Sequence, residues 1–103
     1  MNLYYMMAYH NARNQVLSDI KRTLVLDVLK PHSPPLPDFA AFLSEFDGVD
    51  KIDITVLEMD EKTETIKVVI IGSLFDYEEL KAHMSKQGAV IHSVDQVIVE
   101  NVK

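Results

Sequence analysis

The order in which strand-like and helix-like patterns follow one another constrains this chain more than any single residue does. Apolar residues recur at helical spacing in two segments, Leu36–Phe46 and Tyr77–Met84, and a glycine follows each segment, at Gly48 and Gly88. Runs rich in β-branched and apolar residues lie before and after each helical segment. The chain therefore reads as strand, helix, strand, strand, helix, strand, which is the split βαβ arrangement.

The four expected strands cover Leu24–Leu29, Val49–Met59, Thr65–Ile71 and Ala89–Val99. The second and third are close enough along the chain to form a hairpin. Asp76 with Glu79 three residues later predicts the start of the second helix, and Asp95-Gln96 interrupts the last strand as a β-bulge would. We predict an α+β fold, a ferredoxin-like βαββαβ sandwich with a four-stranded antiparallel sheet and both helices on one face.

Composition limits the classes of function. A chain of 103 residues with 48% apolar residues supports one domain core. It has no cysteine, which excludes disulfides and thiolate zinc sites and favours a cytoplasmic protein. The net charge of −6 disfavours nucleic acid as a partner, and no apolar run reaches the roughly 20 residues that span a membrane.

Residues 1–20 stand apart from the βαββαβ unit, which we assign to residues 21–103. Leu3, Met6 and Met7 could line one side of a helix in this N-terminal extension. We expect the extension to dock on a neighbouring subunit. Removal of residues 1–18 should leave a folded domain, because the start and stop signals of the sandwich all follow Ile20.

Four stretches resemble an uncharacterised archaeal family, the domain-of-unknown-function family 211. They are Leu24-Val-Leu-Asp-Val-Leu-Lys-Pro-His32, Phe46-Asp-Gly-Val-Asp50, Thr63-Glu-Thr-Ile-Lys-Val68 and Ile91-His-Ser-Val-Asp95. The resemblance covers about residues 20–103, and the first 18 or so residues depart from its pattern. It implies a ferredoxin-like fold in ring-like homo-oligomers and no established activity.

One face of the predicted sheet is unusually apolar for a surface. If Leu24, Leu26 and Val28 face the helices, the alternate residues of the strand point the other way. The residues expected on this open face are Val25, Asp27, Leu29, Leu57, Val69 and Ile71. Monomers seldom expose such a patch, so we expect a ligand surface or a subunit interface in a homo-oligomer larger than a dimer. The alternative is a solvated Asp27 on a half-buried strand.

Four polar residues form a candidate metal site at the ends of the first and last strands. Asp27, His32, His92 and Asp95 have side chains suited to a divalent ion, and the two strands are neighbours in this fold. Their spacing matches no metal motif. The alternative is a loop histidine that contacts backbone carbonyls and a strand histidine that packs on a neighbour.

The remaining motifs do not identify a reaction. The acidic segment Met59–Glu64 reads as a solvated hairpin turn, and no serine lies in a nucleophile elbow. The leading hypothesis is a non-enzymatic homo-oligomeric module that binds a small ligand or ion at subunit interfaces. A metal-dependent enzyme that uses the His/Asp set is the alternative, and a structural adaptor is a third hypothesis.

Overall fold

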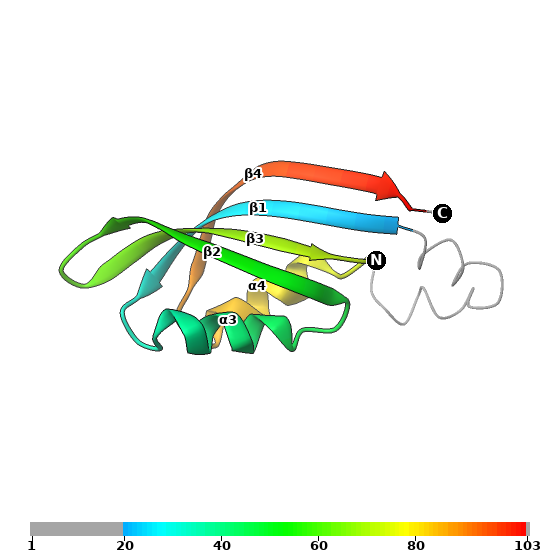
Figure 1. The fold of residues 1–103 in the computed structure, drawn as a ribbon. Helices are drawn as coiled ribbons and strands as arrows, with labels where there is room; N and C mark the ends of the chain where they lie inside the picture. Colours follow the sequence, from blue (N-terminus) through cyan, green and yellow to red (C-terminus); the bar gives the residue numbers. More distant parts are fainter. Residues whose placement is uncertain (1–19, 103) are drawn as a thin grey trace.

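The computed structural model describes residues 20–102 and contains the predicted order of elements (Figure 1). They are β1 (Ile20–Pro31), α3 (Leu36–Ser44), β2 (Val49–Met59), β3 (Thr63–Gly72), α4 (Tyr77–Ser85) and β4 (Val90–Asn101). The predicted α+β class and βαββαβ order are confirmed. The predicted extension over residues 1–20 lies outside the described residues, apart from Ile20, which begins β1.

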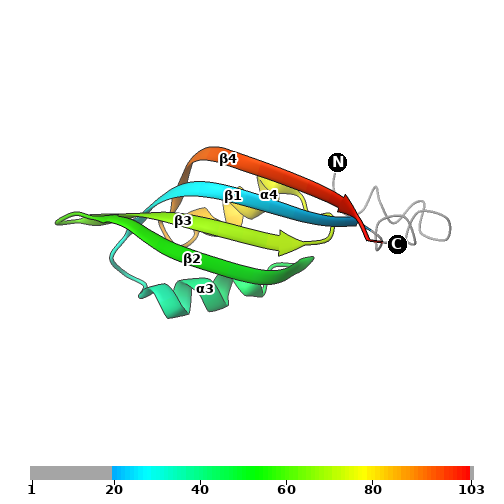
Figure 2. The ribbon, with the colours of Figure 1, turned by 45° about the horizontal axis from the view of Figure 1, so that its top comes forward.

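The sheet has four strands in the order β2-β3-β1-β4, and each neighbouring pair is antiparallel. Both helices lie on the same side of this sheet, and the other side is open (Figures 1 and 2). β2 and β4 are therefore the two edges. No helix within residues 20–102 is long and apolar enough to cross a membrane.

The core lies between the sheet and the helices. Alternate residues of the two central strands are buried against it, as the period of a strand requires. The buried apolar side chains are Leu24, Leu26, Val28, Phe39, Leu43, Ile66, Val68, Ile70, Phe75, Leu80, Met84 and Ala89. The predicted orientation of Leu24, Leu26 and Val28 toward the helices is confirmed, so the intervening residues of β1 face the open side.

The ends of α4 follow from two residues. The side chain of Asp76 accepts hydrogen bonds from the backbone N–H groups of Glu78 and Glu79, which confirms the predicted N-cap. Gly88 follows the helix with φ +78°, a conformation that costs glycine little because it has no Cβ. These signals fix where the chain turns back toward β4.

Two register breaks shape β4. The pairing of β4 with β1 skips Asp95, between Gln96 and Val94, which confirms the predicted bulge. It also skips His92, between Ile91 and Ser93, a second irregularity that the sequence pattern did not predict. Each extra residue lies outside the regular pairing. His92 and Asp95, the two β4 residues of the predicted metal site, therefore both lie at bulges.

Candidate functional site

The open face of the sheet carries the predicted apolar residues of the two central strands. Val25 pairs with Val69 across β1 and β3, and Ile71 lies one pair further along the same face. All three are half-buried by their neighbours, whereas Leu29 is 43% exposed. Leu57 lies at a register break in β2 and is 57% exposed.

A pocket of about 290 Å³ opens on this face. It is lined by Asp27 and Leu29 from β1, Thr65 from β3 and His92 from β4. Leu29 and Thr65 are direct partners in the register of the two central strands, and His92 is the extra residue of a bulge. Three adjacent strands thus supply one wall each.

Asp27 has an unusual environment for a carboxylate. Its Oδ1 atom is closed to solvent and accepts no hydrogen bond from any described residue. The register places Lys67 directly across from Asp27, yet Oδ1 receives no donor from it. A buried polar atom without a partner costs free energy, about 1–3 kcal/mol in typical cases.

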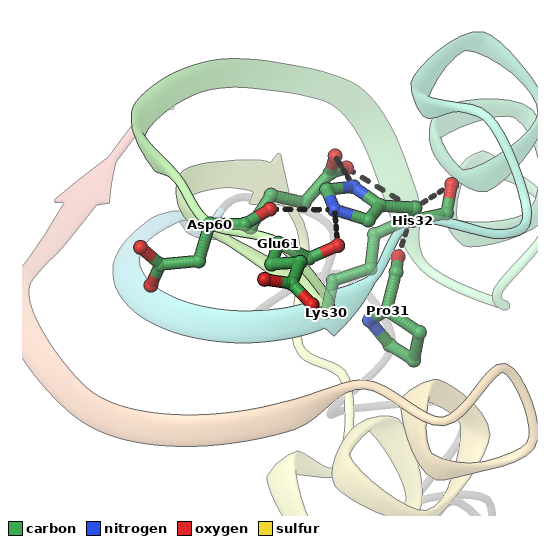
Figure 3. A network of polar contacts seen from close by, with 6 residues as sticks. Lys30, Pro31, His32, Asp60 and Glu61 are labelled. Carbon is green, nitrogen blue, oxygen red and sulfur yellow. Dashed lines mark hydrogen bonds and ion pairs between the residues drawn. The ribbon is translucent and has the colours of Figure 1, made fainter.

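A second polar cluster lies at the same end of β1 as the pocket, but Lys30 and Glu64 continue the buried, helix-facing series of their strands. Figure 3 shows its network of polar contacts. Lys30 has no exposed surface, and its Nζ atom lies 3.1 Å from Oε1 of Glu64, which is 5% exposed. Nζ also donates to the carbonyl oxygens of Pro31 at 2.7 Å and His32 at 3.4 Å. Three acceptors surround the three-proton donor, so the buried ammonium group is fully paired.

His32 joins this ion pair to the β2–β3 hairpin. Its Nδ1 lies 3.2 Å from Oε2 of Glu64, and its Nε2 lies 2.7 Å from the carbonyl oxygen of Asp60 and 3.1 Å from that of Glu61 (Figure 3). Every one of these partners is an acceptor, and only the imidazolium form has a proton on both ring nitrogens. The hydrogen bonds to Asp60 and Glu64 therefore raise the pKa of His32 above its ordinary value.

The four predicted metal-binding residues do not form one cluster. Asp27 and His92 line the open-face pocket, whereas His32 is bonded to the hairpin and Glu64. Asp95 accepts a hydrogen bond from the Ser93 hydroxyl at 2.7 Å. Among residues 20–102, no three histidine or acidic side chains lie close enough together to hold a metal ion. For His32, the structure matches the alternative of a loop histidine on backbone carbonyls.

Sequence reasoning missed two residues of the polar cluster. Glu64 was assigned to a solvated hairpin turn, but it is buried because it continues the inward-facing series of Ile66 and Val68 on β3. Lys30 likewise continues the inward-facing series of Leu26 and Val28 on β1. Strict alternation was the signal that could have placed both, and their opposite charges explain how the core tolerates them.

Comparison with other proteins assigns the described part of the chain to a family. A family model described as "Uncharacterized ArCR" (DUF211) matches residues 22–102. The chain is also 42% identical over 77 residues to "Uncharacterized protein MJ0319" of Methanocaldococcus jannaschii, an alignment that covers 75% of this chain and 79% of that protein. The residues that the family model matches span both helices and nearly all of the four strands. This chain therefore belongs to the uncharacterised DUF211 family.

Proposed function

We propose that this protein is a non-enzymatic, self-associating module that binds a small ligand at the open face of its sheet, beside a subunit boundary. The observation that carries the proposal is the amount of apolar surface left on the edge strand β4. Its exposed large apolar residues are Val90, Val94, Val97, Ile98 and Val99. Val102 continues the series beyond the strand and is 53% exposed.

These residues lie on both faces of β4. Val94 pairs with Leu26, which faces the helix layer, yet Val94 is 43% exposed. Ile98 pairs with Thr23 and faces the open side. A strand that is apolar on both faces is typical of the middle of a sheet or of a packed interface, where other elements cover it.

The occupant that we propose for this edge is a second copy of the chain. An edge strand offers unpaired backbone groups along one side, and natural edges are commonly protected by charged residues, proline, β-bulges or a covering element. β4 has bulges at His92 and Asp95, but beyond them it pairs regularly with β1 from Gln96 to Asn101. β4 contains no lysine, arginine or proline between Val90 and Asn101. Pairing with another copy would cover the backbone groups and the apolar side chains together.

The open face supplies a second surface for assembly. Leu29 is exposed there, on the same face as the half-buried Val25, Val69 and Ile71, and Leu57 is exposed at the register break of β2. One two-fold contact at the β4 edge would leave much of this face uncovered, which supports an assembly larger than a dimer. We propose a cytoplasmic location, which a chain without cysteine favours.

The metal-dependent enzyme receives less support than the binding module. His32 already uses both ring nitrogens on Glu64 and the hairpin carbonyls, so it is not free to bind a metal without losing these bonds. Asp27 and His92 remain as a pair beside an open pocket. Two side chains in a pocket suit ligand binding better than they suit a protein metal site.

Light scattering on two valine variants tests the self-association. Val97 on β4 is 55% exposed, and Val56 on the other edge strand is 39% exposed. Val97→Lys should shift the mass toward that of a single chain of 11.7 kDa, because the charge would be buried at the contact. The matched change Val56→Lys should leave the mass of the wild-type assembly unchanged. A wild-type protein that is monomeric at micromolar concentration would rule the proposal out.

A further inference from the structure

We propose that the pocket between Asp27 and His92 binds a small organic cation, a primary ammonium group on a short apolar chain. The inference rests on the proposed function, because it names the ligand class of that same open face. The pocket measures about 290 Å³, which suits a compact ligand. Its walls combine one carboxylate, one imidazole, one hydroxyl and one leucine side chain.

The β-bulge at His92 shapes this pocket. In a regular pairing every residue of β4 would stand opposite a residue of β1, but the register skips His92 between Ile91 and Ser93. The extra residue changes the local direction of the side chains, and His92 is one of the pocket walls. Bulges are over-represented next to functional sites, where they redirect a side chain.

Asp27 supplies the preference for a hydrogen-bond donor. Its Oδ1 atom has neither solvent nor a donor from the described residues, so folding leaves this acceptor without an interaction. The terminal torsion of an aspartate is broad, so a rotation of the carboxylate can present either oxygen to the pocket. A ligand N–H could donate to the carboxylate oxygen that faces the pocket, and a charged donor would form the stronger, charge-assisted kind of hydrogen bond.

The remaining walls favour a cation with an apolar chain. Leu29 is 43% exposed and offers an apolar wall next to the carboxylate. Thr65 and His92 can each orient a second polar group. The net charge of −6 attracts cations to the protein and repels anions. A divalent ion would find only Asp27 and His92 as ionic or imidazole ligands in this pocket, fewer than such ions normally take.

Lys67 is the cation within the chain that could compete for Asp27. It is the direct partner of Asp27 in the register of β1 and β3, and its side chain is exposed. A long lysine side chain can swing toward the carboxylate when the pocket is empty. Removal of its charge should therefore favour a ligand ammonium group, and Lys67→Met becomes a diagnostic variant.

The test is an NMR titration of the full chain with three probes of similar size: n-butylammonium chloride, 1-butanol and sodium butyrate. We expect butylammonium to shift the amide signals of Asp27, Thr65 and His92, with much smaller shifts from the other two probes. Butanol tests the apolar chain alone, and butyrate tests the opposite charge. Equal binding of all three probes, or stronger binding of butyrate, would overturn the proposal.

Three variants locate the binding. Asp27→Asn should weaken butylammonium binding about tenfold, as expected for loss of a charge-assisted hydrogen bond. Asp53→Asn is the matched control, since Asp53 is an exposed carboxylate on the same face, opposite Val69. Lys67→Met should tighten binding. If Asp27→Asn and Asp53→Asn lose equal affinity for butylammonium, the binding depends only on the overall negative charge of the protein. If Lys67→Met binds butylammonium more weakly than the wild type, Lys67 does not compete with the ligand for Asp27.

Light scattering on the same samples separates this inference from the proposed self-association. If the protein is monomeric but still selects butylammonium through Asp27, the proposed self-association is wrong and the proposed cation pocket is supported. If the protein assembles but does not bind butylammonium selectively, the proposed cation pocket is wrong and the proposed self-association is supported. The selectivity among the three probes is measured on the wild-type chain, so the test does not depend on the folding of a variant.

Discussion

The two edge strands of this sheet differ in how they end it. β2 carries charged residues at Asp50, Lys51, Asp53 and Glu58, and its exposed apolar residues gather near the hairpin. β4 carries exposed apolar residues along most of its length and on both faces. The two edge strands of one sheet therefore need not be equally protected from pairing with another strand. The charged residues of β2 protect that edge from pairing with another strand, whereas β4 is the edge at which we propose that a second copy pairs.

The hairpin end of β2 is also anchored by polar contacts within the chain. His32 is bonded to the carbonyl oxygens of Asp60 and Glu61, and Glu64 joins it to the buried Lys30. The described part of β4 has one side-chain hydrogen bond of this kind, the short-range contact between Ser93 and Asp95. Contacts with another subunit would therefore protect β4 more than they would protect β2.

The largest effect should come from a charged substitution in the core of the sandwich, on which both edge strands depend. Leu26→Asp would bury an unpaired charge at a position with no exposed surface, and we expect a loss of about 4 kcal/mol or more in the free energy of unfolding. Val69→Asp and Leu29→Asp on the open face should weaken assembly more than they destabilise the monomer. Circular dichroism with light scattering distinguishes the two outcomes, and identical behaviour of all three variants would refute the assignment of the faces.

Most of the fold was predictable, because alternation and helix signals are local. The N-cap at Asp76 followed from Asp76 and Glu79, which lie three residues apart, and the bulge at Asp95 followed from Asp95-Gln96. The pocket was less predictable, because it depends on the register between three strands and on a bulge at His92 that no local pattern marked. Charge was misleading at Glu64, since its burial depends on a lysine that is distant in the chain.

A smaller effect should come from the anchor of the β2 hairpin. Glu64→Leu would leave the ammonium group of Lys30 buried without its carboxylate, and we expect a loss of about 3 kcal/mol in stability. The double variant with Lys30→Met should recover most of this loss, because it removes both charges. Urea denaturation of the single and double variants measures the difference. A single variant as stable as the wild type would show that the ion pair does not anchor the hairpin.

The smallest effect should be a pH dependence at the same hairpin. The folded state raises the pKa of His32 above its ordinary value of 6.5, so the imidazolium contacts stabilise the protein fully below that value. This contribution is lost as the pH rises through the higher pKa of the folded state. NMR titration of the His32 ring should show the raised pKa, and His32→Gln should remove this part of the pH dependence. An unshifted ring titration would contradict the assigned hydrogen bonds.

Amide hydrogen exchange of the two edge strands, measured on the full chain at low and high protein concentration, tests the central claim most directly. Alternate amides of an edge strand point away from the sheet and exchange rapidly unless another strand pairs with them. Our account predicts that outward amides of β4 become protected as the concentration rises, while those of β2 stay unprotected. Rapid exchange of both edges at every concentration would contradict the claim that β4 is completed by a second copy.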